Sequence, residues 1–320
     1  ARFERGLFDP ETAVGKSLFD HTIWVICSDG DLEEGVSAEA SSLAGTQELG
    51  NLVIIYDDNR ISIEGDTHNA FTEDVSARYR AYGWQVIDVP AAADGRIDLP
   101  AVDAAMISAK AELTKPSLIR MHSVIAWPAP KAKGTAGSHG SALGAEEIAE
   151  TKKILGLNPD EHFALSDEVF AHVRKVKERG AQSRKDWESR LASWQNSNPN
   201  EAALLKRLQN SELTAGWDSE LPVFEAGSQL ATRAASGKAI NALAKKMPEL
   251  WGGSADLAGS NNTDIEGGGS FLPATSAIKN ANPYGRIVHF GIREHAMGSI
   301  LNGAALHGLS RSFGGTFLVF

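Results

Sequence analysis

Two polar turns carry side chains suited to holding a cation beside a phosphate group. Asp29 and Gly30 follow one short apolar run, and Asn59 follows the next. Thirty positions separate Asp29 from Asn59, the length of a strand-helix-strand unit, so both turns are expected side by side at the carboxyl edge of a parallel sheet. Carboxylate and amide oxygens suit Mg²⁺ or Ca²⁺, and Gly30 lets backbone approach a phosphate. The alternative is two polar turns that only close strands.

Four other residues have side chains with a chemical use. Glu294 stands where a strand is expected to end and a helix to begin, so its carboxyl either complements the helix dipole or faces a cofactor. His139, flanked by glycine in a long loop, is either exposed polar surface or part of a site. Arg233 and Ser260 are either ordinary surface residues or phosphate ligands.

The elements expected to position these residues alternate between strand and helix. Continuous apolar runs joined by helices favour a parallel sheet with helices on both faces, which makes this an α/β fold. A second, similar α/β segment follows it. The expected strands are 22–27, 52–56, 84–89, 117–124 and 286–292, and the expected helices are 36–48, 98–112, 236–250 and 294–306. Residues 249–255 lead into a loop rich in Gly, Ser and Asn.

The middle of the chain predicts a long loop, a helical stretch and a connection between domains. Residues 126–142 are rich in Pro, Gly and Ala, and loops of this length are often functional. Helical spacing of apolar residues follows from position 169. We therefore expect a first domain over 1–195, a linker over 196–228 and the beginning of a second domain over 229–320.

Bulk composition excludes several classes of partner. The 320 residues carry a net charge of −10 and no long basic run, so neither nucleic acid nor a membrane surface is an expected partner. No apolar run reaches the roughly 20 residues of a membrane span, and no signal peptide is apparent. The single cysteine, Cys27, fits a reducing compartment, which favours the cytoplasm. The absence of an initial Met and the apolar final residues suggest a piece of a longer protein.

Seven segments, in order along the whole chain, resemble the transketolase family. The resemblance is greatest to bacterial transketolases and points to an actinobacterial one. The segments are SDGDLEEGVSAEASSLAGTQELGNLVIIYDDNRISIEG (28–65), RYRAYGW (78–84), GSHGSALG (137–144), ATRAASG (231–237), ELWGGSADLAGSNNT (249–263), HFGIREHAMG (289–298) and GGTFLVF (314–320).

The resemblance implies thiamine diphosphate as cofactor and a divalent metal, Mg²⁺ or in its place Ca²⁺ or Mn²⁺. The family's metal ligands match Asp29, Asn59 and the backbone carbonyl of Ile61. One position departs from the family pattern, because Ser28 stands where the family usually has Gly. The first domain would then be the diphosphate-binding (PP) domain without its N-terminal part, and the second the beginning of the pyrimidine-binding (Pyr) domain.

The resemblance also implies roles in catalysis and binding. Glu294 matches the catalytic Glu that hydrogen-bonds the cofactor's aminopyrimidine ring. His139 matches a His near the diphosphate and the reacting carbonyl, and Arg233 and Ser260 match binders of the sugar phosphate. The remaining matches are to residues that line the cofactor pocket, namely Gly30, Asp256, Leu257, Phe317 and Phe320.

The activity so implied is transfer of a two-carbon glycolaldehyde unit from a ketose phosphate to an aldose phosphate, such as xylulose 5-phosphate and ribose 5-phosphate, in the pentose phosphate pathway. Family members are homodimers with each site between two subunits and about twice this length, so the isolated chain is expected to be inactive. Two alternatives stay open: a non-catalytic fragment or assembly module, and an enzyme like 1-deoxyxylulose-5-phosphate synthase.

Overall fold

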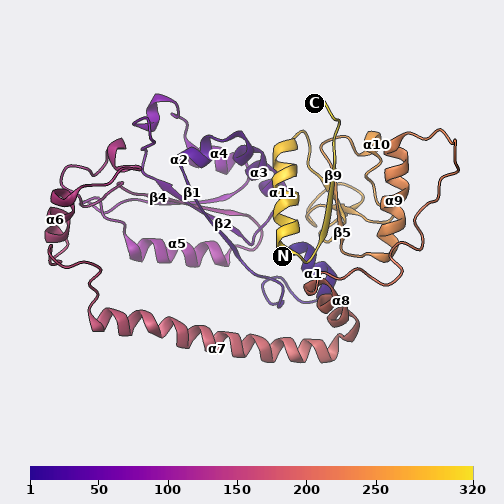
Figure 1. Cartoon of the computed structure of the whole chain (residues 1–320), viewed down its shortest axis with the longest axis horizontal. Helices are drawn as coiled ribbons and strands as arrows, with labels where there is room; N and C mark the ends of the chain where they lie inside the picture. Colours follow the sequence, from indigo (N-terminus) through magenta and orange to yellow (C-terminus); the bar gives the residue numbers. More distant parts are fainter. Residues whose placement is uncertain (320) are drawn as a thin grey trace. The chain divides into compact units, whose positions relative to one another are not determined.

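A computed structural model describes residues 1–319 of the chain (Figure 1). Contacts divide the chain into two compact units, each built on its own sheet of parallel strands. Unit 1 comprises residues 1–21, 38–48 and the chain from 190 onward, and unit 2 comprises residues 22–37 and 49–189.

The sheet of unit 2 has the strand order β1-β2-β4-β3. Its strands are β1 (Ile23–Ser28), β2 (Leu52–Asp58), β3 (Gln85–Val89) and β4 (Ser117–His122). All three pairings are parallel, as the continuous apolar runs predicted. The register places Ser28 beside Asp57 and Asp58 beside His122, so the polar residues that end β1, β2 and β4 meet at one edge.

Helices cover both faces of this sheet, with α4 (Val75–Ala81) and α5 (Leu99–Ala111) on opposite sides (Figure 1). The Asp98 carboxylate caps α5 by accepting a hydrogen bond from the backbone N–H of Ala101 at 3.1 Å. Small buried residues on α5 allow it to pack closely on the sheet. The other helices here are α2 (Asp29–Glu33), α6 (Ala145–Ile154) and the short 3-10 turns η1 (Thr67–Asn69) and η2 (Ala136–Ser138).

The sheet of unit 1 has the strand order β7-β6-β8-β5-β9. Its central strand β5 is buried throughout, and successive side chains point to opposite faces. Leu250 packs against α9, while Trp251 packs against Phe3 of α1 and Met297 of α11. The strands are β5 (Leu250–Ser254), β6 (Ser270–Phe271), β7 (Ala281–Asn282), β8 (Ile287–His289) and β9 (Arg311–Gly315), and the helices are α1 (Arg2–Phe8), α9 (Thr232–Lys246), α10 (Ala258–Asn261) and α11 (Glu294–His307).

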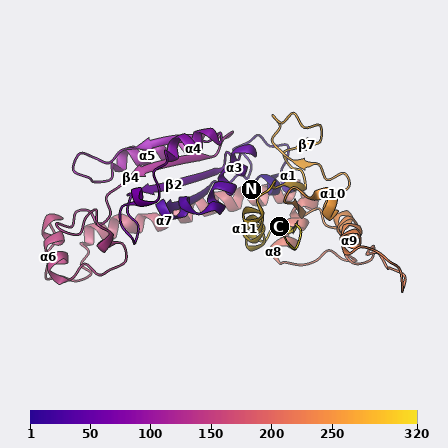
Figure 2. The same ribbon diagram turned by 90° about the horizontal axis from the view of Figure 1, so that it is seen from above.

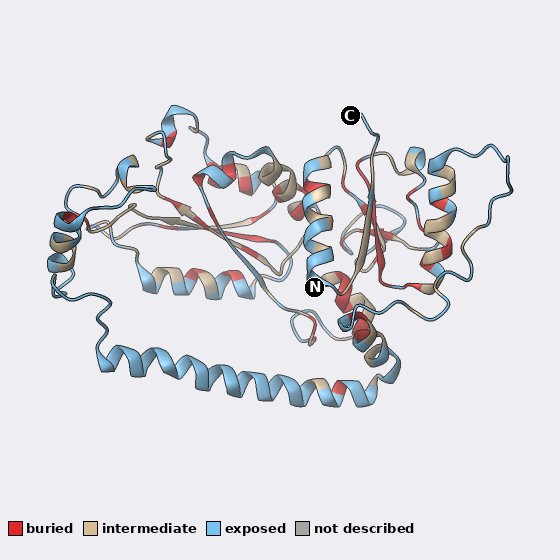
Figure 3. Ribbon diagram, in the orientation of Figure 1, coloured by how far each residue is buried: buried red, intermediate tan, exposed pale blue. Residues whose placement is uncertain are grey.

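Two helices differ in burial or position from what the sequence led us to expect, and a third matches its expected range. Helix α7 (Asp167–Ser197) is one continuous helix that is exposed along almost its whole length, with only Trp194 buried (Figure 3). Helix α8 (Pro199–Gln209) lies in residues expected to be linker, and its Leu205 and Leu208 are buried. Helix α3 (Gly35–Thr46) matches the expected helix 36–48. No helix within residues 1–319 is both long and apolar enough to cross a bilayer.

Candidate functional site

The carboxylate of Asp29 is buried and held by the neighbouring strand. Its Oδ1 accepts a 2.6 Å hydrogen bond from the Tyr56 hydroxyl, and its Oδ2 accepts one of 3.1 Å from the backbone N–H of Arg60. Asn59 Oδ1 in turn accepts from the backbone N–H of Ile61 at 2.9 Å. The structure therefore brings the three expected metal-binding residues together, as the parallel pairing of β1 with β2 requires.

A second buried carboxylate, Asp58, lies beside the first and contacts two arginine side chains and one histidine. Arg120 Nε and His122 Nδ1 each lie 2.8 Å from Asp58 Oδ2, and Arg60 Nε lies 3.6 Å from Oδ1. Tyr56 connects the two carboxylates, because its hydroxyl is also 3.3 Å from Asp58 Oδ1. The sequence indicated only that Asp58 lay in a polar turn, because Arg120 and His122 come from β4, more than 60 positions away.

The basic side chains contact Asp58 and leave the Asp29 carboxylate suited to a metal ion. Asp29 is 2% exposed, and no cationic side chain among residues 1–319 forms an ion pair with it. Burial raises the pKa of Asp29, while the hydrogen bond from Tyr56 opposes that rise. A buried carboxylate with an amide oxygen and a backbone carbonyl nearby is the hard donor set of Mg²⁺ or Ca²⁺. The residues present therefore fit a divalent cation.

The turn at Ser28 accommodates its departure from the family pattern. Ser28 has an extended backbone with φ of −120°, which any residue adopts, so glycine is not required there. Its backbone N–H donates to Asp31 Oδ2 at 2.8 Å, and this contact caps α2. A Cβ built on Gly30 would meet no atom within 4 Å, so this side of the turn is open. Asp29 itself lines a cavity of about 270 Å³.

His139 comes at the end of η2 in the long loop and is exposed. The loop is not free, because the buried Glu147 carboxylate of α6 accepts hydrogen bonds from the backbone N–H groups of Lys131 and Ala132, at 2.6 and 2.8 Å. These hydrogen bonds hold the start of the loop in place. Within residues 1–319, no other expected site residue contacts the His139 ring.

In unit 1, Glu294 is the first residue of α11 and is half-buried. The N-terminal end of α11 is capped by a residue of another helix. Oε2 of Glu39, in α3, accepts a hydrogen bond from the backbone N–H of Ala296 at 2.9 Å. Arg293 also binds α3, donating to the Ser42 hydroxyl at 3.1 Å. Glu39 thus satisfies one of the free N–H groups at this end of α11, a role that the Glu294 carboxyl does not take there. Nothing in the sequence indicated Glu39.

Three other expected pocket residues lie at the same edge of this sheet as Glu294. Asp256 and Leu257 follow the carboxyl end of β5, Phe317 follows that of β9, and Glu294 follows that of β8. These three strands are parallel neighbours, with β5 between the other two, so their ends meet. Asp256 has a φ of +60°, an uncommon conformation for a residue other than glycine. Phe320 lies outside the described residues.

Arg233 and Ser260 are exposed residues on two helices that pack together. Arg233 is in the first turn of α9 and Ser260 is in α10, and the two helices lie side by side (Figure 2). Close packing depends on Gly237, where an added Cβ would lie 2.7 Å from Asn262 Cβ. A hollow of about 650 Å³ lies between the same helices. The pair is thus near an open hollow whose lining includes Lys238 and Asn241.

Two family models match consecutive parts of the chain. The family model described as "Transketolase, thiamine diphosphate binding domain" matches residues 1–214, and the one described as "Transketolase, pyrimidine binding domain" matches residues 228–320. Residues 215–227, between the two matches, are turns and irregular structure.

Similar proteins are known in both sequence and structure. Over all of this chain, transketolase from Mycobacterium tuberculosis is 51% identical and that from Geobacillus stearothermophilus 46% identical, each with 46% of its length covered. A transketolase structure from Pichia stipitis, in complex with sedoheptulose 7-phosphate, superposes with a TM-score of 0.90 at 39% identity, over 99% of this chain and 46% of that one. The chain thus spans about half the length of its curated relatives, and it belongs to the transketolase family.

Proposed function

We propose that the full-length protein containing this chain is a transketolase that uses thiamine diphosphate and a divalent metal. It would move a two-carbon glycolaldehyde unit from a ketose phosphate to an aldose phosphate. The observation that carries the proposal is the match of both transketolase domains, in order, over almost the entire chain. Structures of relatives in complex with xylulose 5-phosphate and fructose 6-phosphate support sugar phosphates as substrates.

The anchoring half of the proposed site is in unit 2. Asp29, Asn59 and the Ile61 carbonyl would hold the metal, which neutralises the buried Asp29 carboxylate and binds the diphosphate. Tyr56 orients Asp29 through its 2.6 Å hydrogen bond. Gly30 leaves room for the phosphate beside the turn. These contacts bind and orient, and they move no proton.

The activating half is in unit 1. When bound, thiamine diphosphate supplies a nucleophilic carbon that carries the two-carbon unit. Glu294 would hold a proton at N1′ of the pyrimidine ring, its carboxyl being aimed by the end of α11 that Glu39 caps. Asp256 and Leu257 would line the ring's pocket, and Phe317 would stack on the ring.

Substrate binding is assigned to three polar residues. Arg233 and Ser260 would bind the sugar phosphate, since a guanidinium binds phosphate through paired hydrogen bonds. His139 would approach the reacting carbonyl from its loop. The proposal includes xylulose 5-phosphate and ribose 5-phosphate as substrates and the pentose phosphate pathway as setting. It also includes a cytoplasmic homodimer with each site between subunits. The domains are proposed as 1–195 and 229–320, joined by 196–228.

The proposal is tested with Glu294→Ala in the full-length protein. Loss of the proton-holding carboxyl should lower the rate of sugar-phosphate transfer by roughly 100-fold or more at limiting cofactor. Glu168→Ala is the matched control, because Glu168 is also an acidic residue in a first helical turn but lies on the exposed α7. Equal rates for Glu294→Ala and the parent protein would disprove the role of Glu294.

Two further measurements address the alternatives. Calorimetry of the 320-residue chain with thiamine diphosphate and Mg²⁺, beside a transfer assay, separates a binding module from an enzyme. Binding without transfer is expected, because each complete site is proposed to need two subunits. Product analysis with pyruvate addresses the resemblance to 1-deoxyxylulose-5-phosphate synthase, and no pyruvate-derived product is expected.

A further inference from the structure

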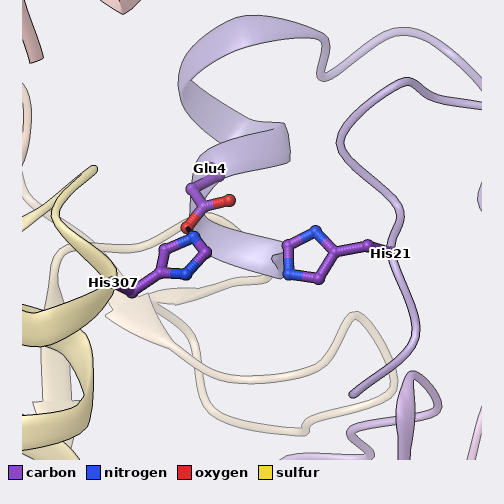
Figure 4. Close-up of side chains that lie close together, drawn as sticks. All are labelled: Glu4, His21 and His307. Atoms are coloured by element: carbon purple, nitrogen blue, oxygen red, sulfur yellow. Dashed lines mark ion pairs between the residues drawn. The ribbon is translucent and has the colours of Figure 1, made fainter. Parts of the chain in front are cut away.

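Three side chains of the kinds that bind metal ions meet in unit 1 (Figure 4), at the opposite end of α11 from Glu294. Glu4 comes from α1, His21 from the segment after α1, and His307 is the last residue of α11. One candidate ligand atom from each residue lies within 4.8 Å of the others. His307 Nε2 is 2.6 Å from Glu4 Oε1, and the two imidazole rings stack with centroids 5.6 Å apart.

The cluster is held by well-packed elements. On α1, Phe3 and Phe8 enter separate hydrophobic clusters on either side of Glu4. The last turns of α11, which carry His307, pack against the cluster that contains Phe3. The Glu4 side chain is only 8% exposed, while that of His307 is 46% exposed. The site therefore combines a buried carboxylate with imidazoles open to solvent, which gives a metal ion a path in.

The distances suit a tetrahedral ion. Bonds of about 2.0–2.2 Å to nitrogen and oxygen place tetrahedral ligand atoms about 3.4 Å apart. The observed separations, from 2.6 Å to at most 4.8 Å, bracket that value, so small side-chain rotations are enough to form the site. One carboxylate with two imidazoles is a ligand set found at zinc sites that keep a fourth position for water.

The electrostatics also favour a cation. His307 stands at the carboxyl end of α11, where the helix dipole is negative. Partial desolvation lowers the pKa of the His21 ring. The other charged groups nearby are the Ala1 amine, 3.8 Å from Glu4 Oε1, together with Arg2 and Asp20.

A simple ion pair explains only part of this arrangement. Contact between Glu4 and His307 accounts for two of the three residues, whereas the stacking of His21 on His307 brings a second imidazole to the same place. Two charged imidazoles at this separation would repel each other, whereas a shared metal ion binds both in neutral form.

We propose that Glu4, His21 and His307 bind one divalent transition-metal ion of the zinc type, with the fourth position open. The ion would join α1, the segment after it and the end of α11. The donor set is rich in nitrogen and so differs from the all-oxygen set proposed around Asp29, which suits Mg²⁺.

The test is calorimetric titration of the metal-free 320-residue chain with Zn²⁺ in excess Mg²⁺, which occupies the oxygen-rich site. One zinc ion should bind, and His21→Ala and His307→Ala should each weaken binding by about 100-fold or more, because even indirect supports of a metal cost 10- to 100-fold. Glu4→Gln should do the same. His172→Ala, which removes an exposed imidazole from α7, should leave binding unchanged.

Thermal melting provides a second readout that does not depend on titration heats. Zn²⁺ should raise the Tm of the parent chain and of His172→Ala, but not the Tm of the three site variants. Melting without metal shows whether each variant is folded. Acetylation of the Ala1 amine should leave zinc binding intact. Unchanged affinity in His21→Ala, or binding that is lost on acetylation, would overturn the proposed three-residue site.

Discussion

Replacing Tyr56 by Phe removes one buried oxygen atom. It tests whether the Tyr56 hydroxyl holds Asp29, the proposed metal ligand, in position. That hydroxyl is 2.6 Å from Asp29 Oδ1 and 3.3 Å from Asp58 Oδ1, and Tyr56 is 2% exposed. Without it, no side chain among the described residues fixes the rotation of the Asp29 carboxylate, since the remaining contact is to the Arg60 backbone.

The size of the effect follows from the hydrogen bond that is lost. A hydrogen bond to a charged group contributes about 1.5–3 kcal/mol. At about 1.4 kcal/mol for each factor of ten, this is roughly 10- to 150-fold in affinity. A separate estimate comes from mutating residues that orient metal ligands, which typically lowers metal affinity by about 10- to 100-fold. We therefore expect Tyr56→Phe to weaken metal-dependent binding of thiamine diphosphate by about 10- to 100-fold.

The assay is calorimetric titration of the full-length protein with thiamine diphosphate at fixed Mg²⁺. Tyr82→Phe is the matched control, because it removes the same atom from a half-buried tyrosine whose ring packs on Tyr79. Circular dichroism should show the same fold for both variants. An affinity within about twofold of the parent for Tyr56→Phe would refute the view that this hydroxyl positions Asp29.

Three other predictions concern stability and reactivity. Arg207→Ala should lower the free energy of unfolding in urea by about 2–3 kcal/mol, because it removes two 2.9 Å contacts from the fully buried Glu249, which within residues 1–319 keeps only the ion pair with Arg311 at 3.5 Å. Cys27 in the metal-free chain should react with a disulfide reagent at pH 8 roughly 1,000-fold more slowly than free cysteine, because burial raises its pKa to about 12. Gly253→Ala should cost about 3 kcal/mol or more in the same urea assay, since its Cβ would lie 1.9 Å from the Val288 carbonyl oxygen on the neighbouring strand.

Each of these has a control within the chain. Arg207→Lys keeps the charge and should lose less stability than Arg207→Ala; equal losses would contradict the paired geometry. Unfolding in urea should restore ordinary reactivity to Cys27, and the native rate should rise tenfold per pH unit well beyond pH 8; a plateau near pH 9 would contradict the raised pKa. Gly298→Ala, in α11 with no atom near the added Cβ, should be neutral or stabilising.

Local sequence was enough to predict most of the regular structure. Strands β1 to β4 and helices α5 and α11 begin and end within a few residues of their predicted bounds. Continuous apolar runs and helical spacing are local signals, so the sequence is enough to detect them. The position of Asp29 beside the turn that contains Asn59 followed from the same logic, since one strand-helix-strand unit places consecutive turns together. Helices α8 and α10 were not predicted, because their many polar and small residues gave no clear helical pattern of apolar positions.

The tertiary structure alone decided which groups meet across long stretches of chain. Asp58 became a charge centre because β4 inserts between β2 and β3 and brings Arg120 and His122 to it. Glu39 caps α11 across 257 positions. Glu4 and His307 come from opposite ends of the chain. The residue types and their local spacing indicated the family and the turn that we propose to bind a metal ion. Sheet order and helix packing determined the partners of those residues, because such contacts depend on how the elements pack and leave no local pattern.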